Sequence, residues 1–353
     1  MRKIPKRWRE LPIKSRLEIP VKYFNIDEKT LDKIRKISDS KKRLIEAARI
    51  QFELFGDIHS YLTTWIAGYG SDVVIRNNFG STKALLELFM KLPNTENQNF
   101  SWADIKRNIK IPKEMDENLA KETGLHIGDG NLYITNHEGN LHSYRYCISG
   151  DLTDELIFHT EYIANLMKKL YNINGTFVQR IDKNSIDSKY HSKAIVQFKN
   201  ETLKLPIGSK KDIKIPNLIL KNNDFMKKCI SGIIDTDFNI TSSLAISGKI
   251  NNLFVAKEMH LIFNKNNIDH VYRLYDKYAR FYIPKKGAKN ILTDWKLDNP
   301  KHISKFLVFE EFKKFIPFTT TTERLALLDG KIDINELEKI SEKRKINLSH
   351  PNF

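Results

Sequence analysis

The sequence predicts an α+β protein in which one unit of helices and strands occurs twice. Two observations lead to this prediction. The tetrapeptide "IKIP" occurs at 109–112 and again at 213–216, and each copy leads into a helix-like segment that ends at an aspartate, Asp129 or Asp237. The same order of strand and helix patterns then follows each aspartate. The separation of the two aspartates, at 129 and 237, is too long for one repeat of a solenoid, and β-rich sequence follows each of them. Together these features indicate duplicated domains.

The first copy contains the patterns of two hairpins and a helix. After Asp129, the run "NLYITNHEGNLHSYRYCIS" alternates apolar and polar residues on both sides of Glu138-Gly139-Asn140, which predicts a hairpin. The segment "TDELIFHTEYIANLMKKLYNI" has the apolar spacing of an amphipathic helix. The runs "GTFVQRID" and "HSKAIVQFKN" are then predicted to form a second hairpin.

The second copy repeats this order. "NITSSLAIS" is predicted to be a strand, "NNLFVAKEMHLIFNKNN" a helix, and "HVYRLYDKYARFYIPK" a pair of strands. Each unit is therefore expected to follow the order αββαββα. We expect domains at 1–108, 109–212, 213–320 and 321–353, the last being a helical tail.

Residues 1–108 are predicted to be a basic leader followed by helices. Between 69 and 93, apolar spacing on both sides of Asn78-Phe79-Gly80, with Ser81 as an N-cap, predicts two successive helices. This pair is compatible with a helix-turn-helix, but apolar spacing plus a turn favours an ordinary pair of packed helices. The segment 94–101 is expected to be a linker or surface loop.

Composition limits the partners and the compartment. The chain has 353 residues and a formal net charge of +16, which makes a polyanion such as nucleic acid the expected partner. Its two cysteines, Cys147 and Cys229, exclude a disulfide scaffold and indicate a reducing compartment. No secretory signal and no run of about 18 apolar residues is found. We expect an intracellular protein of the cytoplasm, nucleoid or an organelle, neither secreted nor membrane-bound.

The two aspartate motifs resemble those of the LAGLIDADG homing endonucleases, in the single-chain form with two repeats. The resemblance rests on "LAKETGLHIGDGNLY", "FMKKCISGIIDTDFNI", the two IKIP segments and the later "DNPKHISKF", and it covers roughly 109–318. It implies two pseudo-symmetric repeats whose sheets form a DNA-binding saddle, in a monomer. It also implies that the two motif helices pack against each other through small residues, here Gly124, Gly128 and Gly232.

The resemblance further implies a metal-dependent phosphodiester hydrolase. Asp129 and Asp237 would be the catalytic carboxylates and would hold two or three divalent cations, Mg²⁺ with Mn²⁺ as a substitute, at sites that cut both strands across the minor groove. A basic residue is expected beside each metal, at the end of the last strand of each repeat. By position these residues are Lys199 and Lys285, for which a solvated strand-end lysine is the alternative reading.

The strands after each motif are expected to contact DNA. Alternation in "HSYRYCIS" places Ser143 and Arg145 on one face, and Arg180 lies in the next predicted hairpin. In the second repeat the comparable residues are Arg273 and Arg280, together with Tyr275 and Tyr282. Arginine can contact guanine with two hydrogen bonds, whereas lysine mostly contacts phosphates.

The second motif departs from the family pattern at two positions. Phe238 stands where the first motif has Gly130, and Lys228 stands where the first has Ala120. Because Phe238 could displace Asp237, three functions remain open. The first is a site-specific endonuclease for a long double-stranded DNA target. The second is a cleavage-weakened nickase or an RNA maturase that binds intron RNA. The third is an unrelated basic α+β regulator that reuses the fold.

Overall fold

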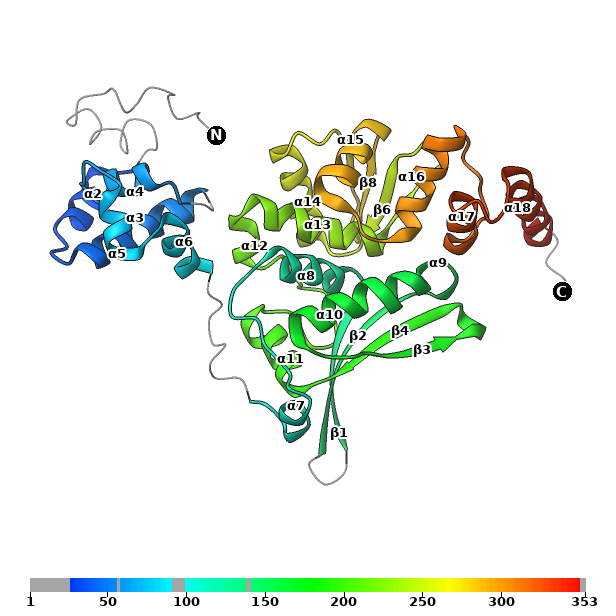
Figure 1. Cartoon of the computed structure of the whole chain (residues 1–353), viewed down its shortest axis with the longest axis horizontal. Helices are drawn as coiled ribbons and strands as arrows, with labels where there is room; N and C mark the ends of the chain where they lie inside the picture. The colour runs from blue at the N-terminus through cyan, green and yellow to red at the C-terminus, as the bar shows by residue number, and fades with distance from the viewer. Residues whose placement is uncertain (1–25, 56–57, 91–98, 138–140, 350–353) are drawn as a thin grey trace. The chain divides into compact units, whose positions relative to one another are not determined.

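The computed structural model describes residues 26–55, 58–90, 99–137 and 141–349 (Figure 1). These residues form two compact units, one made of the described residues up to 90 with Asn217–Asn223, the other of those from 99 to 216 and from 224 to 349. The basic leader, most of the predicted linker and the predicted turn at Glu138-Gly139-Asn140 lie outside the described residues.

The first unit is helical. Its elements are α2 (Glu28–Arg35), α3 (Ser40–Phe55), α4 (Ser60–Ile66), α5 (Val73–Phe79), α6 (Thr82–Met90) and α12 (Asn217–Lys221). The predicted helix pair is confirmed as α5 and α6. Gly80 ends α5 with a positive φ of 76°, a conformation that glycine adopts without steric cost. Ser81 Oγ then accepts a hydrogen bond from the backbone N–H of Ala84 at 3.0 Å, as expected of an N-cap.

The first repeat lies in the second unit. After the short helix α7 (Trp102–Lys106), its elements are α8 (Glu117–Asp129), β1 (Gly130–His137), β2 (Leu141–Asp151), α9 (Leu152–Ile157), a π-helical segment (Phe158–Ile163), α10 (Ala164–Tyr171), β3 (Thr176–Arg180), β4 (Ser185–His191) and α11 (Lys193–Gln197). The four strands form an antiparallel sheet in the order β1-β2-β4-β3.

The second repeat has the same order of elements. These are α13 (Asn223–Asp237), β5 (Phe238–Ile240), β6 (Ile246–Ile250), α14 (Leu253–Lys265), β7 (Val271–Leu274), β8 (Ala279–Ile283), α15 (Lys285–Asn290), a π-helical segment (Ile291–Lys296) and α16 (Pro300–Phe312). Its sheet has the order β5-β6-β8-β7. The equivalent strand order confirms the predicted α+β fold of two αββαββα repeats.

One predicted strand is wrong. The run "HSKAIVQFKN" was expected to be the second strand of a hairpin, but β4 ends at His191 and the chain continues as α11 and a π-helical segment, Phe198–Thr202. Ser192 Oγ accepts from the backbone N–H of Ile195 and caps the helix. Ala194, Ile195 and Val196 are all buried, so consecutive apolar residues here reflect a helix enclosed on several sides and not a strand.

The predicted strand "NITSSLAIS" is in fact two strands. It is divided into β5 and β6 by a tight turn between Ile240 and Ile246. Thr241 donates its backbone N–H to the carbonyl of Ala245 at 2.9 Å, and Leu244 adopts a positive φ of 58°. The second repeat therefore makes a much shorter hairpin after its aspartate than the first repeat does.

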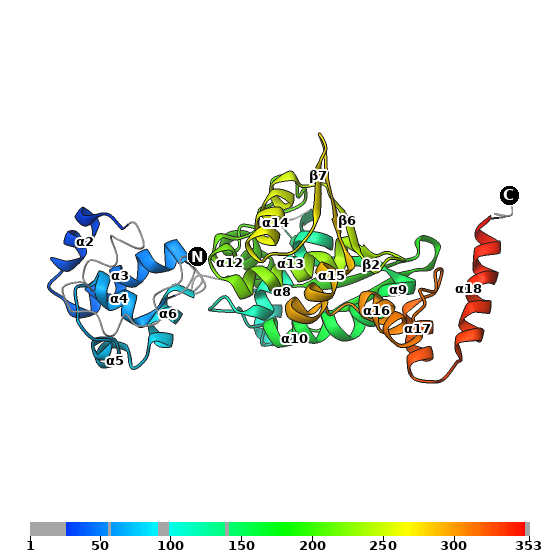
Figure 2. The ribbon, with the colours of Figure 1, turned by 90° about the horizontal axis from the view of Figure 1, so that it is seen from above.

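Two helices follow the second repeat, α17 (Thr321–Leu328) and α18 (Ile334–Ser349) (Figure 2). Val308 of α16, Ile316, Leu327 and Leu337 form a small apolar core that holds these helices to α16. Among the described residues, none of the helices combines the length and apolar character needed to span a bilayer.

Candidate active site and nucleic-acid interface

The two motif helices, α8 and α13, lie side by side in both views of the ribbon (Figures 1 and 2). Glycine makes this contact possible. A β-carbon on Gly124 would overlap the carbonyl group of Cys229, and one on Gly232 would lie 2.5 Å from the carbonyl oxygen of Lys121. Such separations are shorter than van der Waals contact, so any larger residue would push the helices apart. Gly128 lies near the same contact, against the side chain of Thr236.

A buried ion pair also links the helices. Lys121 of α8 donates its Nζ to Asp235 of α13 at 2.6 Å and to the hydroxyl of Ser231 at 3.1 Å. A second carboxylate, Asp298, lies 2.8 Å from the same Nζ, and Asp235 also accepts the backbone N–H groups of Asp298 and Asn299. Asp235 is therefore fully engaged as a structural carboxylate. Lys228, the other departure from the motif, is 3.9 Å from Glu117 of α8.

Asp129 and Asp237 are the last residues of α8 and α13, so the helix contact brings both carboxylates to the same end of the pair. A β-carbon on Gly128 would lie 3.3 Å from Asp237 Oδ2, which shows how closely the second carboxylate approaches the first helix. Burial raises the pKa of Asp129 to about 7, and repulsion from Asp237 and Glu155 acts in the same direction. Burial raises the pKa of Asp237 to about 6, with Glu155 again contributing.

Two lysines oppose these shifts, and neither was predicted. Lys210 and Lys301 both lower the pKa of each aspartate through their charge. Lys210 lies between the repeats and donates its Nζ to the carbonyls of Ile127, at 3.1 Å, and Gly128. It is thereby fixed at the C-terminal end of α8, where a cation is favoured by the helix dipole. Lys301 lies in the first turn of α16, which Asn299 caps and Pro300 begins.

Glu155 of α9 is a third carboxylate near the aspartates, but its oxygens already have partners. Oε2 accepts the backbone N–H of Asp151 at 2.8 Å, and Oε1 accepts from Asn299 Nδ2 at 3.0 Å and from Lys301 Nζ at 3.2 Å. Glu155 therefore holds Lys301 in place. This role was not predicted from the sequence, because Glu155, Asn299 and Lys301 come from segments that are far apart in the chain.

A polar pocket of about 300 Å³ adjoins Asp237. Three lysines line it, Lys210, Lys211 and Lys249, together with Ser209, Asn251 and Asn252. Asn252 Nδ2 donates to the carbonyls of Lys210 and Lys211 at 3.1 and 2.8 Å, which fixes the inter-repeat segment against the start of α14. Three cations beside one carboxylate suit a phosphate group.

The structure does not place the two predicted lysines beside the aspartates. Lys199 is completely buried in the π-helical segment after α11, where its Nζ donates to both oxygens of Glu122 at 2.7 Å. It is not a strand end, because the predicted strand is a helix. Lys285 is the first residue of α15, and its Nζ lies 4.4 Å from the centre of the Phe309 ring. Lys210 and Lys301 are the described cations whose charges lower the pKa values of both aspartates.

The outer face of the first sheet carries the residues predicted to contact DNA. Arg145 pairs with Tyr133 of β1 and His191 of β4, and its guanidinium lies 4.6 Å from the centre of the Tyr133 ring. Ser143 lies two residues before it on the same face, half-buried. Burial lowers the pKa of His191, and the charges of Arg145, Arg107 and Lys189 lower it further, so this face is positive.

Arg180 lies at the end of β3 on this same sheet and contacts an acidic residue. Its Nη2 donates to Asp187 Oδ2 at 2.8 Å, while Ser149 Oγ donates to Asp187 Oδ1 at 2.7 Å. Lys189 Nζ is 3.8 Å from the same carboxylate. Both oxygens of Asp187 are engaged, so Asp187 orients Arg180 and is not itself free to bind another donor.

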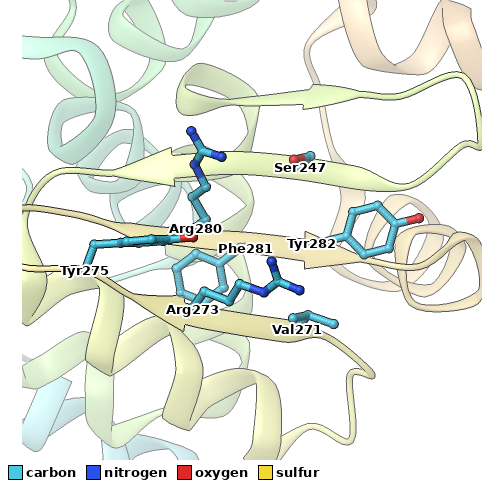
Figure 3. Close-up of a pocket in the computed structure, with 7 residues that line it drawn as sticks. All are labelled: Ser247, Val271, Arg273, Tyr275, Arg280, Phe281 and Tyr282. Carbon is cyan, nitrogen blue, oxygen red and sulfur yellow. The ribbon is translucent and has the colours of Figure 1, made fainter.

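The outer face of the second sheet carries a row of three cations. Arg280 of β8 lies directly between Lys249 of β6 and Arg273 of β7. All three are exposed, and like charges directly opposite each other destabilise a sheet unless an anion is bound. Arg273, Arg280, Tyr275 and Tyr282, all predicted to contact DNA, line a hollow of about 280 Å³ on this face (Figure 3).

Asp129 and Asp237 together fit a hydrated divalent cation. Two half-buried carboxylates with raised pKa values repel each other, and a cation beside them would remove that repulsion. Among the described residues, no three His, Cys, Asp or Glu side chains gather as a metal-binding group. The pair of carboxylates suits Mg²⁺, which is commonly bound by one or two carboxylates and completes its coordination with water and substrate phosphates.

Comparisons with known proteins give only weak similarities. No family model matches the chain, and no curated protein matches it. Among solved structures, I-DmoI in complex with DNA and Mn is 18% identical, with a TM-score of 0.42 and coverage of 52% of this chain and 97% of that one. The LAGLIDADG meganuclease I-AabMI bound to uncleaved DNA is 12% identical over 65% and 98%, with a TM-score of 0.38. These scores do not by themselves assign a family.

Proposed function

We propose that this chain is a site-specific, metal-dependent DNA endonuclease of the LAGLIDADG type, which hydrolyses one phosphodiester bond in each strand of a long double-stranded target. The observation that carries the proposal is the placement of Asp129 and Asp237. Two helices in direct backbone contact end together at two half-buried carboxylates with raised pKa values. Strongly perturbed carboxylates gathered beside cations are typical of catalytic sites.

The sheet faces support DNA as the substrate. Arg145, Arg180, Arg273 and Arg280 lie on outer sheet faces, each within a strand that follows one of the aspartates. Such residues can contact base edges, while the lysines around Asp237 contact phosphates. Because one chain supplies both aspartates and both sheets, the protein acts as a monomer.

Each residue of the site has a separate task in the proposed mechanism. Asp129 and Asp237 hold the divalent cations, Mg²⁺ or Mn²⁺. The bound cations would lower the pKa of water and neutralise charge at the reacting phosphorus. Lys210 and Lys301 stabilise the negative charge that develops on the phosphate oxygens, and Glu155 keeps Lys301 oriented. The two carboxylates act on opposite strands across the minor groove.

The test begins with a target selected from randomised double-stranded DNA and inserted into a supercoiled plasmid. With Mg²⁺, the unaltered chain should convert the plasmid to linear DNA. Asp129→Asn and Asp237→Asn should each slow this conversion greatly with little loss of binding, because the amide keeps the shape but removes the charge. Linearisation by Asp237→Asn at the unaltered rate would refute the two-site mechanism. A product nicked in one strand would indicate a nickase, and sequence-specific binding without cutting a maturase or regulator.

A further inference from the structure

The residue that follows each aspartate is paired across the sheet in a complementary way. In the first repeat Gly130 is directly opposite Ile148, and in the second Phe238 is directly opposite Gly248. Each pair thus contains one glycine and one large apolar residue, but the order is reversed. The second repeat therefore differs from the first at two paired positions. Phe238 replaces Gly130 after the aspartate, and Gly248 replaces Ile148 on the neighbouring strand.

Phe238 and Gly248 fit each other closely. Phe238 is completely buried, and its ring centre lies 6.1 Å from that of Phe281 on β8. A β-carbon on Gly248 would lie 2.7 Å from Cε1 of Phe238 and closer still to two other ring atoms. The Phe238 ring therefore occupies the space that any side chain at position 248 would need, and Gly248 is the residue that leaves it vacant.

The first repeat has no room for a side chain at the residue after its aspartate. A β-carbon on Gly130 would lie 2.4 Å from Cα of His126 and 2.8 Å from its Nδ1, and the buried His126 ring packs 5.3 Å from that of Tyr146. The residue aligned with His126 in the second repeat is Ile234, which is smaller. The second repeat thus carries a large buried ring on the strand, at Phe238, where the first repeat carries one on the helix, at His126.

We propose that Gly248 is a positioning residue for Asp237: it admits the Phe238 ring into the core, and this ring anchors the peptide unit that follows the carboxylate. The inference rests on the proposed function, in which Asp237 is one of the two catalytic carboxylates. Asp237 ends α13 and Phe238 begins β5, so the anchor lies at the junction that determines where the carboxylate points. The second site is accordingly intact, and Phe238 is part of its construction.

The experiment compares three variants with the unaltered chain. Gly248→Val obstructs the ring, Phe238→Gly removes it, and the double variant Phe238→Gly with Gly248→Ile gives the second repeat the arrangement of Gly130 and Ile148. Ser242→Val, at an exposed position in the adjoining turn, is the control for added apolar surface. Asp129→Asn and Asp237→Asn identify the strand that depends on each aspartate.

Each single variant should slow cleavage of the Asp237-dependent strand by about 100-fold, because a displacement of the Asp237 carboxylate on the order of 1 Å has an effect of this size. The cleavage rate of the other strand should not change. The nicked intermediate should therefore persist, as in Asp237→Asn. The double variant should regain most of the lost rate and most of the lost melting temperature. Ser242→Val should match the unaltered chain.

Two results would overturn the proposal. If Gly248→Val slows both strands equally, residue 248 affects the fold in general and not the position of Asp237. If the double variant regains its melting temperature but not the rate on the Asp237-dependent strand, the pair contributes packing alone.

A readout without cleavage separates this inference from the proposed function. Mn²⁺ should raise the melting temperature of the unaltered chain by binding both carboxylates. The rise should be smaller in each single variant and restored in the double variant, even if the chain cuts neither strand and the proposed function fails. An equal rise in all the variants would refute the positioning role.

Discussion

At the scale of single residues, the charged forms of Asp129 and Asp237 lower the stability of the fold but are the forms that the proposed metal binding requires. Both carboxyl groups have pKa values in the folded chain, about 7 and about 6, that are above the ordinary value of about 3.9 in an unfolded chain. Between these values the folded state binds more protons than the unfolded state. Stability should therefore fall as the pH rises from about 4 to about 7.

The first prediction follows from this fall in stability with rising pH. Without divalent metal, Asp129→Asn should raise the melting temperature at pH 8, because the amide removes a half-buried charge, and should have little effect at pH 4, where the carboxyl is protonated. Thermal unfolding with a chelator at the two pH values measures the difference. Asp276→Asn, at an exposed turn position, is the control. An equal effect at both pH values would show that shape and not charge is responsible.

The second prediction separates a structural lysine from a catalytic one. Lys199→Met leaves the buried Glu122 without its cation and should lower the free energy of unfolding by about 3–5 kcal/mol. Lys210→Met should lower stability much less but slow cleavage, since Lys210 acts on the charges of Asp129 and Asp237. Denaturant unfolding and cleavage assays on both variants measure this contrast. A reversed pattern would restore Lys199 as the residue beside the metal.

The sequence could predict some of these residues and not others. The repeated motif predicted the aspartates and the contact glycines, because both depend on the local chain of one helix. Lys210 and Lys301 were missed because they approach the aspartates from a connecting segment and from a later helix. The Asn299-Pro300 pair does indicate a helix start, and with it the position of Lys301 in a first turn.

At the scale of elements, the αββαββα order was predictable, but the position of the last strand of the first repeat was not, because the predicted strand is a helix that follows β4. Side chains around Arg145 and Arg280 alternate between the two faces of their strands, and one face of each sheet is covered while the other is open. The alternation of apolar and polar residues in the sequence therefore predicts these strands correctly. The run from Ala194 to Phe198 is short, apolar and partly β-branched, and such a run does not distinguish a buried helix from a strand. The cap from Ser192 and the surrounding core decide it.

The third prediction concerns the recognition of DNA bases by the outer face of the first sheet. Asp187 holds one nitrogen of Arg180 and leaves its other N–H groups available for a guanine. Arg180→Ala should remove a guanine preference at one target position, corresponding to about 1–3 kcal/mol of discrimination. Asp187→Asn should weaken the preference at that same position, because the guanidinium is no longer oriented. Selections from randomised DNA with each variant locate the affected position.

Arg273→Ala is the control for this prediction, since it should alter a position in the other half of the target. If Asp187→Asn changes affinity uniformly and leaves every base preference intact, the Asp187–Arg180 pair is only a surface ion pair.

At the scale of the whole molecule, charge governs association. The net charge of +16 should make DNA binding fall steeply with salt, because each neutralised phosphate releases counterions. The fourth prediction is that deletion of residues 1–20, which are rich in lysine and arginine, weakens binding to many sequences alike and reduces the slope of log K against log salt. Titrations of specific and unrelated duplexes at several salt concentrations measure this. A loss confined to the specific duplex would mean that the deleted segment reads bases.

The ion pair between Lys121 and Asp235 has a consequence for the way such a chain can be recombined. A chimera that joins the first half of this protein to the second half of another would bury Lys121 opposite a helix without its carboxylate, at an expected penalty of about 3–5 kcal/mol. Each half of the protein supplies one member of this ion pair, so the two halves depend on each other for stability. Engineers who wish to graft a new half-site onto this scaffold should exchange the sheets and leave α8 and α13 together.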